Sequence, residues 1–315
     1  MTIYPQKVEG LSFLLFGFTP ILTIKILEKG DFMNINWFPG HMAKTKRLLK
    51  DQLKLIDVVI ELLDARIPYS SSNPEFLELY SDKPRIIVLN KSDLSDMNLN
   101  KQWKENFISK EQSCVLVDTV KGKGISDVKR ELKEQMAEKI ENSKARGRIS
   151  RPVRTMVVGI PNVGKSSFIN KIAGRSVAIT GDKPGVTRNQ QWVRISQEID
   201  LLDTPGVLWP KFETQEVAIN LSATGAIKDT VIDIVEVCVK LLSYLRENYY
   251  LLLKDRFKLV ELEEDAYNLL LLIGKKRGCI VSGGEVDPYR AASVILDEFR
   301  SGKIGNITLD IPPSQ

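Results

Sequence analysis

Short apolar runs alternate with amphipathic stretches through the first two thirds of the chain. Continuous apolar runs bounded by turn residues are typical of buried parallel strands, and a period near 3.6 is typical of helices. Strands are expected at 57–63, 85–89, 114–117, 153–158 and 199–202, and helices near 74–80, 100–108, 125–140 and 167–172. This alternation predicts an α/β fold with a parallel, doubly wound sheet and ligands at the carboxyl ends of its strands.

The pattern changes after residue 212, where only the helical period recurs. It covers 231–244, 266–273 and 288–299, which predicts a smaller all-helical domain. A length of 315 residues suits one large or two medium domains, and we favour two. The predicted division is an α/β domain at 33–211, a helical domain at 212–309 and a tail at 310–315.

The first 32 residues fit neither domain. Residues 11–27 are largely apolar but broken by Gly17, Pro20 and Lys25, too short for a membrane span of about 20 residues and without a small-residue cleavage site. Back-translation of Glu28–Phe32 gives a purine-rich, ribosome-binding type of sequence just before the codon of Met33. We therefore expect residues 1–32 to be a non-native leader and Met33 to be the true start, which N-terminal sequencing of the native protein would check.

The segment Gly159–Ser166 has the residues of a phosphate-binding loop. It follows an expected strand and precedes an expected helix, the context that this motif requires. Its glycines let backbone N–H groups converge on phosphates, Lys165 can reach the β and γ phosphates, and the Ser166 hydroxyl can ligate Mg²⁺. The same loop brings to the nucleotide Asn162, Val163, Gly164 and Ser167.

Two further segments suit the same chemistry. The run 199–202 ends in Asp203, whose carboxylate can hold the Mg²⁺ shell, and Gly206 can offer its N–H to the γ phosphate. Thr187, between the phosphate-loop helix and the next strand, suits a switch loop whose hydroxyl joins the Mg²⁺ shell. The alternative for Thr187 is an ordinary Pro-Gly turn.

The tetrapeptide Asn90-Lys91-Ser92-Asp93 follows another buried strand and indicates base recognition. Asp93 can accept both the N1 and N2 hydrogens of guanine, whereas adenine would leave the carboxylate unpaired at a cost of about 1 to 3 kcal/mol or more. By itself the segment is also a good turn, but beside the phosphate loop it predicts guanine binding. The second base-contacting segment, 118–122, is too divergent for us to assign a residue, and Asp64 and Arg66 either brace the pocket or form a structural turn.

The base-reading motif precedes the phosphate loop, so the chain resembles a circularly permuted P-loop GTPase. Such an order is permissible because domain termini lie close together and can be joined and reopened elsewhere. Residues 34–44, 64–68 and 302–305 extend the resemblance to the RbgA/YlqF family of bacterial ribosome-biogenesis GTPases. Other permuted families carry an oligonucleotide-binding barrel or a zinc module, and neither is present in this sequence.

The resemblance implies a slow GTPase that binds GTP and GDP and is stimulated by the immature large (50S) ribosomal subunit. It would promote a late maturation step, contact ribosomal RNA through the helical domain, leave on hydrolysis and be a monomer off the ribosome. Val207 occupies the place where Ras-like enzymes have the glutamine that orients water, and Val cannot do so. The resemblance assigns that role to His41, the single histidine, which could otherwise be a surface or capping residue.

Potassium is a second expected cofactor beside Mg²⁺. Asn162 matches the asparagine that potassium-activated GTPases place in the phosphate loop, where a monovalent cation adds positive charge near the transferring phosphoryl group. This remains a hypothesis for a comparison of K⁺ with Na⁺ to test.

Composition permits these interpretations without proving them. The chain is 43% hydrophobic and 27% charged, as in an ordinary soluble protein, and its net charge of +5 allows nucleic acid binding. Basic clusters lie at 44–47, 144–154 and 275–277, although each alone is more often a solvated face. The three cysteines are far apart and form no disulfide framework, which fits a reducing cytoplasm. The main alternative function is a GTP-dependent switch acting on a protein effector without RNA; no lipidation signal suggests a membrane role.

Overall fold

Six strands form one sheet in the order β3-β2-β1-β4-β6-β5. The computed structural model describes residues 47–145, 152–177, 191–204, 206, 208, 209, 212–261 and 263–313. Five strands pair in parallel: β1 (Val58–Asp64), β2 (Arg85–Asn90), β3 (Ser113–Val117), β4 (Val153–Val158) and β6 (Ile199–Asp203). The edge strand β5 (Gln191–Arg194) is antiparallel to β6. The sequence did not indicate β5, because four residues at a sheet edge carry no long apolar run.

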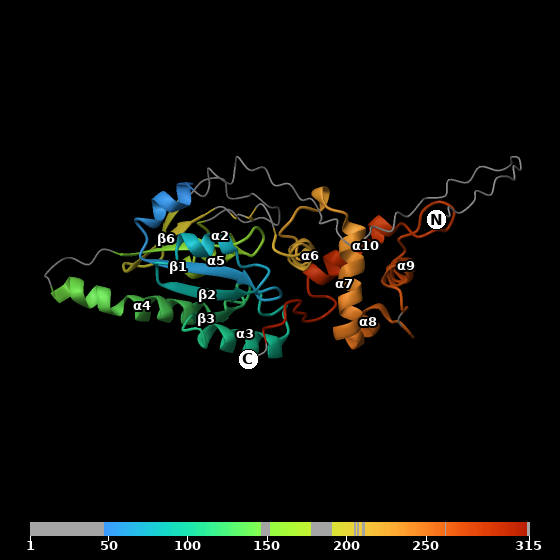
Figure 1. Cartoon of the computed structure of the whole chain (residues 1–315), viewed down its shortest axis with the longest axis horizontal. Coiled ribbons are helices and arrows are strands. Elements are labelled where there is room, and N and C mark those ends of the chain that lie inside the picture. Colours follow the sequence, from blue (N-terminus) through green and yellow to red (C-terminus); the bar gives the residue numbers. More distant parts are fainter. Residues whose placement is uncertain are drawn as a thin grey trace, which may run out of the picture. The chain divides into compact units, whose positions relative to one another are not determined.

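Helices cover the sheet on both faces (Figure 1), as predicted for a doubly wound fold. They are α2 (Pro74–Leu79), α3 (Met97–Ile108), α4 (Ile125–Ala145) and α5 (Lys165–Ala173). Val59 packs in the apolar cluster under α2 and Leu63 in the cluster under α3. Side chains alternate along a strand, so these two positions share a face. The intervening Ile60 and Leu62 are fully buried on the opposite face, where α4 and α5 contact each other.

The remaining helices form what we call the helical region, residues 214–300. Its elements are α6 (Gln215–Ala223), the 3-10 turn η1 (Asp229–Val231), α7 (Ile234–Asn248), α8 (Tyr250–Phe257), α9 (Ala266–Lys276) and α10 (Pro288–Arg300). Helices α7, α9 and α10 pack against one another around apolar side chains. Each begins after an aspartate that accepts hydrogen bonds from first-turn N–H groups. Asp233 therefore starts α7 three residues later than the expected 231.

Two helices of this region escaped the sequence analysis for different reasons. In α6 six of the nine residues are buried, so the helix lacks the polar face that gives a clear period. Helix α8 spans only eight residues, too few for the period to be distinct.

A C-terminal segment, residues 304–310, follows α10 and returns to the sheet. Leu309 donates its backbone N–H to the carbonyl of Arg66 at 2.7 Å, and Trp103 on α3 donates to the carbonyl of Asp310 at 3.0 Å. Asp310, placed in a tail by the predicted division, is only 6% exposed. The domain boundaries themselves stay a prediction.

Several predicted features lie outside the described residues. These are residues 1–32, His41, Thr187, Val207, most of the basic cluster at 44–47 and the central part of the cluster at 144–154. Within the described part, none of the helices is both long and apolar enough to cross a membrane.

Candidate functional site

The phosphate loop connects the end of β4 to the start of α5, as the sequence predicts. Gly164 precedes the helix with a left-handed φ of 98°, and a Cβ atom there would lie 2.5 Å from the Nδ2 of Asn90. Asn162 is also left-handed, with φ of 57°, a conformation that costs energy and is often kept at functional sites. Ser166 and Ser167 follow in the first turn of α5, and Val163 is buried within the loop. The loop therefore has the backbone shape that phosphate binding requires.

Lys165 points back into its own loop. Its Nζ donates to the carbonyls of Gly159 at 3.0 Å and Ile160 at 2.7 Å. Burial lowers the pKa of this ammonium to about 8, although the charge of Asp203 opposes the shift. Gly206 lies so close that a Cβ atom on it would be 2.6 Å from Nζ. The ammonium of Lys165 is thus fixed inside the loop that is predicted to bind the phosphates.

Asp203, at the end of β6, has a buried carboxylate of the kind that binds a cation. Among the described residues its Oδ1 atom is buried without a hydrogen-bond partner. Burial raises the pKa of Asp203 to about 6, against the lowering effect of Lys165. No group of three or more potential metal ligands occurs in the described ranges, but Mg²⁺ usually takes one or two carboxylates together with substrate phosphates and water. Asp203 and the hydroxyl of Ser166 fit that ion, which would neutralise phosphate charge when bound.

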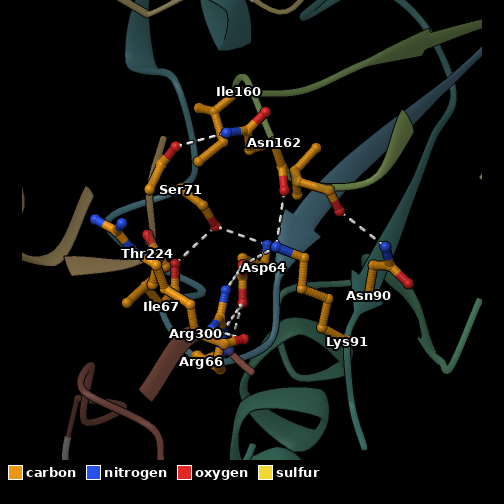
Figure 2. A network of polar contacts seen from close by, with 12 residues as sticks. Asp64, Arg66, Ile67, Ser71, Asn90, Lys91, Ile160, Asn162, Thr224 and Arg300 are labelled. Atoms are coloured by element: carbon orange, nitrogen blue, oxygen red, sulfur yellow. Dashed lines mark hydrogen bonds and ion pairs between the residues drawn. The ribbon is translucent and has the colours of Figure 1, made fainter. Parts of the chain in front are cut away.

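The base loop, residues 90–96, meets the phosphate loop through side chains on its first two residues. Asn90 donates from Nδ2 to the carbonyl of Val163 at 2.8 Å, and Lys91 donates from Nζ to the carbonyl of Asn162 at 2.7 Å (Figure 2). Thr119 in turn donates to Oδ1 of Asn90 at 2.6 Å. The two motifs, 73 residues apart at the Asn90–Val163 contact, therefore form one site at the carboxyl ends of the strands.

An ion network continues from Lys91 to the helical region. Asp64, at the end of β1, accepts from Lys91 Nζ at 3.0 Å and from Arg66 Nη2 at 2.7 Å. Burial would raise the pKa of Asp64, but the two cations outweigh it and hold the pKa well below its usual range. Arg66 is 1% exposed, lies 5.5 Å from the ring centroid of Phe299 and donates from Nη1 to the carbonyl of Arg300 at 3.3 Å. Asp64 and Arg66 thus brace the site as well as forming a turn.

The phosphate loop also contacts the helical region directly. Asn162 donates from Nδ2 to the carbonyl of Gly225, just after α6, at 2.8 Å. Arg300 donates from Nη2 to the carbonyl of Ser222 at 2.9 Å and from Nε to that of Ala223 at 3.0 Å. The same arginine forms an ion pair with Asp229 at 2.8 Å. Polar contacts therefore run from both nucleotide loops to α6 and α10 (Figure 2).

Sequence reasoning missed Thr119, Arg300 and Gly225. Thr119 is the second residue after β3, in the segment 118–122. This place near a strand end is the one signal that could have marked it as a site residue. Nothing local marks Arg300 or Gly225, because their partners in this network are 63 or more residues away.

The fold and the site define a P-loop GTPase whose base-reading motif comes first along the chain. Residues 154–271 match a family model described as 50S ribosome-binding GTPase. Ribosome biogenesis GTPase A of Bacillus cereus is 46% identical over 89% of this chain and 95% of its own length. The Thermotoga maritima protein of the same name is 30% identical over 88% and 95%. The crystal structure of GNP-bound YlqF from T. maritima covers 86% of this chain and 100% of its own, at a TM-score of 0.61 and 25% identity.

The chain belongs to the ribosome biogenesis GTPase A family. It binds guanine nucleotides, hydrolyses GTP and functions in ribosome assembly, and the family implies the usual dependence on Mg²⁺. The predicted fold class, family and enzyme activity are confirmed. The individual roles predicted for the site residues stay predictions.

Proposed function

We propose that this chain binds the immature large (50S) ribosomal subunit, promotes a late step of its maturation and leaves when GTP is hydrolysed. The description of the family model names the 50S subunit, and the names of the relatives refer to ribosome biogenesis. The observation that carries the coupling is the hydrogen bond from the Asn162 side chain to the carbonyl of Gly225, 2.8 Å long. A change at the γ phosphate therefore has a direct route from the phosphate loop to α6 and to the rest of the helical region.

In this proposal each described residue of the site has a distinct task. Lys165 reaches the β and γ phosphates, Ser166 and Asp203 hold Mg²⁺, and Asp93 reads guanine. Further contacts to the nucleotide come from Asn90, Lys91, Asn162, Val163, Gly164, Ser167 and Gly206. The support is the meeting of these loops at one sheet edge and the buried oxygen of Asp203, which has no hydrogen-bond partner among the residues that the structure describes.

Catalysis is assigned to His41 and Thr187 together with Lys165. Thr187 would join the Mg²⁺ shell, and His41 would orient the attacking water that Val207 cannot orient. His41→Ala should therefore retain GTP binding but lose most of the hydrolysis stimulated by the ribosomal subunit. Unchanged stimulated turnover would remove His41 from the mechanism.

Potassium activation belongs to the same proposal through Asn162. At constant ionic strength, replacing K⁺ by Na⁺ should slow hydrolysis, because a monovalent cation beside Asn162 would add positive charge near the γ phosphate. Equal rates in the two salts would rule out this role.

Sedimentation and turnover test the ribosomal partner. With a nonhydrolysable GTP analogue, the protein should travel with immature large-subunit particles through a density gradient, whereas GDP should release it. Purified large subunits should also raise GTP turnover. Lys165→Ala is the matched control, because it removes the phosphate contact and leaves the helical region intact.

A switch that acts on a protein effector would give a different result. It would neither sediment with large subunits nor be stimulated by them, and that pair of outcomes would refute the proposal. The proposal also includes a monomer off the ribosome, a cytoplasmic location, and recognition of ribosomal RNA by the helical domain at 212–309. Crosslinking of the bound RNA would map that last contact.

A further inference from the structure

Three consecutive residues of the C-terminal segment bind the base loop. Asn306 donates from Nδ2 to the carbonyl of Asp93, and Ile307 donates its backbone N–H to the carbonyl of Leu94, each at 3.0 Å. The hydroxyl of Thr308 accepts from the backbone N–H of Asp96, also at 3.0 Å. The backbone of residues 93–96 in the base loop is thus hydrogen-bonded to a segment more than 200 residues later in the chain.

The opposite side of the C-terminal segment is held by the helical region. Tyr244 and Tyr249 each donate their hydroxyl to the carbonyl of Thr308 at 3.1 Å. Thr308 is fully buried, and its backbone N–H donates to the hydroxyl of Tyr249 at 3.1 Å. Three hydrogen bonds therefore anchor the segment to the C-terminal end of α7.

A further anchor follows at Asp310. Its carboxylate accepts from the backbone N–H and the hydroxyl of Ser70, each at 2.7 Å, and from Nδ2 of Asn220 on α6 at 2.8 Å. These partners hold the last residue of the C-terminal segment. The segment that contacts the base loop is thus hydrogen-bonded at Thr308 and at Asp310.

The position of Asp93 decides base selectivity in the proposed function. A carboxylate discriminates guanine only when both oxygens lie in the plane of the base and face its N1 and N2 hydrogens. Asp93 belongs to the loop of residues 93–96, and three hydrogen bonds between the backbone of this loop and the C-terminal segment hold the loop in place. A displacement of a few tenths of an ångström would weaken the two-point contact more than a one-point contact.

We propose that Asn306, Ile307 and Thr308 are positioning residues that set the guanine selectivity of this GTPase by fixing the loop that carries Asp93. The proposal rests on the base-reading role proposed for Asp93. It makes selectivity a property of the C-terminal segment and the helical region as well as of the loop that touches the base.

Asn306→Ala tests the proposal with the least risk to folding, because this side chain is exposed. The measurement compares the affinities of GDP and inosine diphosphate, which lacks the exocyclic amino group that donates the N2 hydrogens. GDP binding should weaken about fivefold, the effect of one hydrogen bond, while inosine diphosphate should lose less. The ratio of the two affinities should therefore shrink about threefold.

Asn248→Ala is the matched control. Asn248 is also exposed and donates its Nδ2 to a main-chain carbonyl, that of Tyr244, at 3.0 Å, but it does not touch the base loop. Both variants should melt at the temperature of the parent. If the ratio of the GDP and inosine diphosphate affinities stays at the parental value in Asn306→Ala, whether or not both affinities fall, the positioning role is overturned.

A second pair of variants acts from the buried side. Thr308→Val removes the acceptor for the Asp96 N–H at nearly constant volume, whereas Thr308→Ser keeps it. Only Thr308→Val should lower the ratio of the GDP affinity to the inosine diphosphate affinity. The serine variant is the control for a general loss of stability. Equal ratios in these two variants would contradict the proposal.

The base-reading role of Asp93 is tested separately. Asp93→Asn should shift preference from GDP to xanthosine diphosphate, because the amide offers a donor to the oxygen at position 2 of xanthine. If that shift is absent, the assignment of Asp93 fails. If it occurs while the Asn306 and Thr308 variants keep the parental selectivity, only the role of the C-terminal segment fails.

Discussion

The phosphate loop and the base loop lie at the same edge of the sheet but are supported in different ways. The phosphate loop has local support, since Lys165 binds the carbonyls of Gly159 and Ile160 only six and five residues away, in addition to its contacts with the base loop and Gly225. The base loop depends on partners far along the chain, such as Asn306, 213 residues from Asp93. Part of the support of the first loop therefore comes from neighbouring residues, whereas the C-terminal support of the second requires most of the fold to be in place.

Asp64→Asn should have the largest effect, because Asp64 joins the base loop to the helical region. The change leaves the guanidinium of Arg66, 1% exposed, without its carboxylate partner. Breaking a buried ion pair in this way costs about 3 to 5 kcal/mol in the free energy of unfolding. Denaturant unfolding followed by circular dichroism measures it.

The surface pair of Asp51 with Lys54, at 3.1 Å, provides the control for that variant. Asp51→Asn should cost less than about 1 kcal/mol, because both groups are solvated. A similar small loss for Asp64→Asn would mean that the long-range support is unimportant, and the contrast between the two loops would disappear.

Lys165→Ala should have the next largest effect, and this effect should be mainly on nucleotide binding, although the variant also loses two hydrogen bonds within the phosphate loop. In the proposed pocket, removal of the ammonium takes away a cationic contact to the β and γ phosphates, so GTP affinity should fall by about 100-fold or more, or about 2.7 kcal/mol. Fluorescent-nucleotide titration measures this loss. The control Lys133→Ala removes an exposed lysine paired with Glu198 and should change affinity less than twofold.

Binding of GTP by the Lys165→Ala variant at the parental affinity would be incompatible with the proposed pocket. So would equal competition by ATP in the parent. Either result would show that the phosphate loop does not hold the nucleotide in the way its local structure suggests.

Thr119→Val should have the smallest effect of the three. The hydroxyl of Thr119 donates to Asn90, and its removal leaves the buried Oδ1 of Asn90 without this donor, at a cost of about 1 kcal/mol in the free energy of unfolding, which denaturant unfolding measures. A double-mutant cycle with Asn90→Ala isolates the pair. Additive effects would show that Thr119 acts independently of Asn90, and the base loop would then have one support fewer.

The predictability of the structure follows the same contrast. The strands, most helices and the phosphate loop depend on neighbouring residues, and apolar runs or a short motif are enough to predict them. The pairing of Lys91 with Asp64 and of Asn162 with Gly225 depends on how the sheet and helices pack, which no local pattern encodes. Gly164 lies between these cases: its motif predicts the glycine, but the close approach of Asn90 explains it.

The helical region shows the same limit. Asp233, Asp265 and Asp287 mark helix starts that can be read from the chain, because capping is local. Arg300 has no such signal, yet it binds the carbonyls at the end of α6 and offers its own carbonyl to Arg66. Its role depends on the arrival of α10 beside α6, which is a property of the tertiary fold.

The separation of Asn306 from Asp93 in the sequence has a consequence for folding during translation. Translation delivers the base loop 213 residues before the amide that supports it, with the phosphate loop made in between. If Asn306 positions Asp93 as proposed, a nascent chain would be able to bind triphosphate before it could distinguish guanine from adenine. Base selectivity would then develop only after the helical region has been synthesised and has folded.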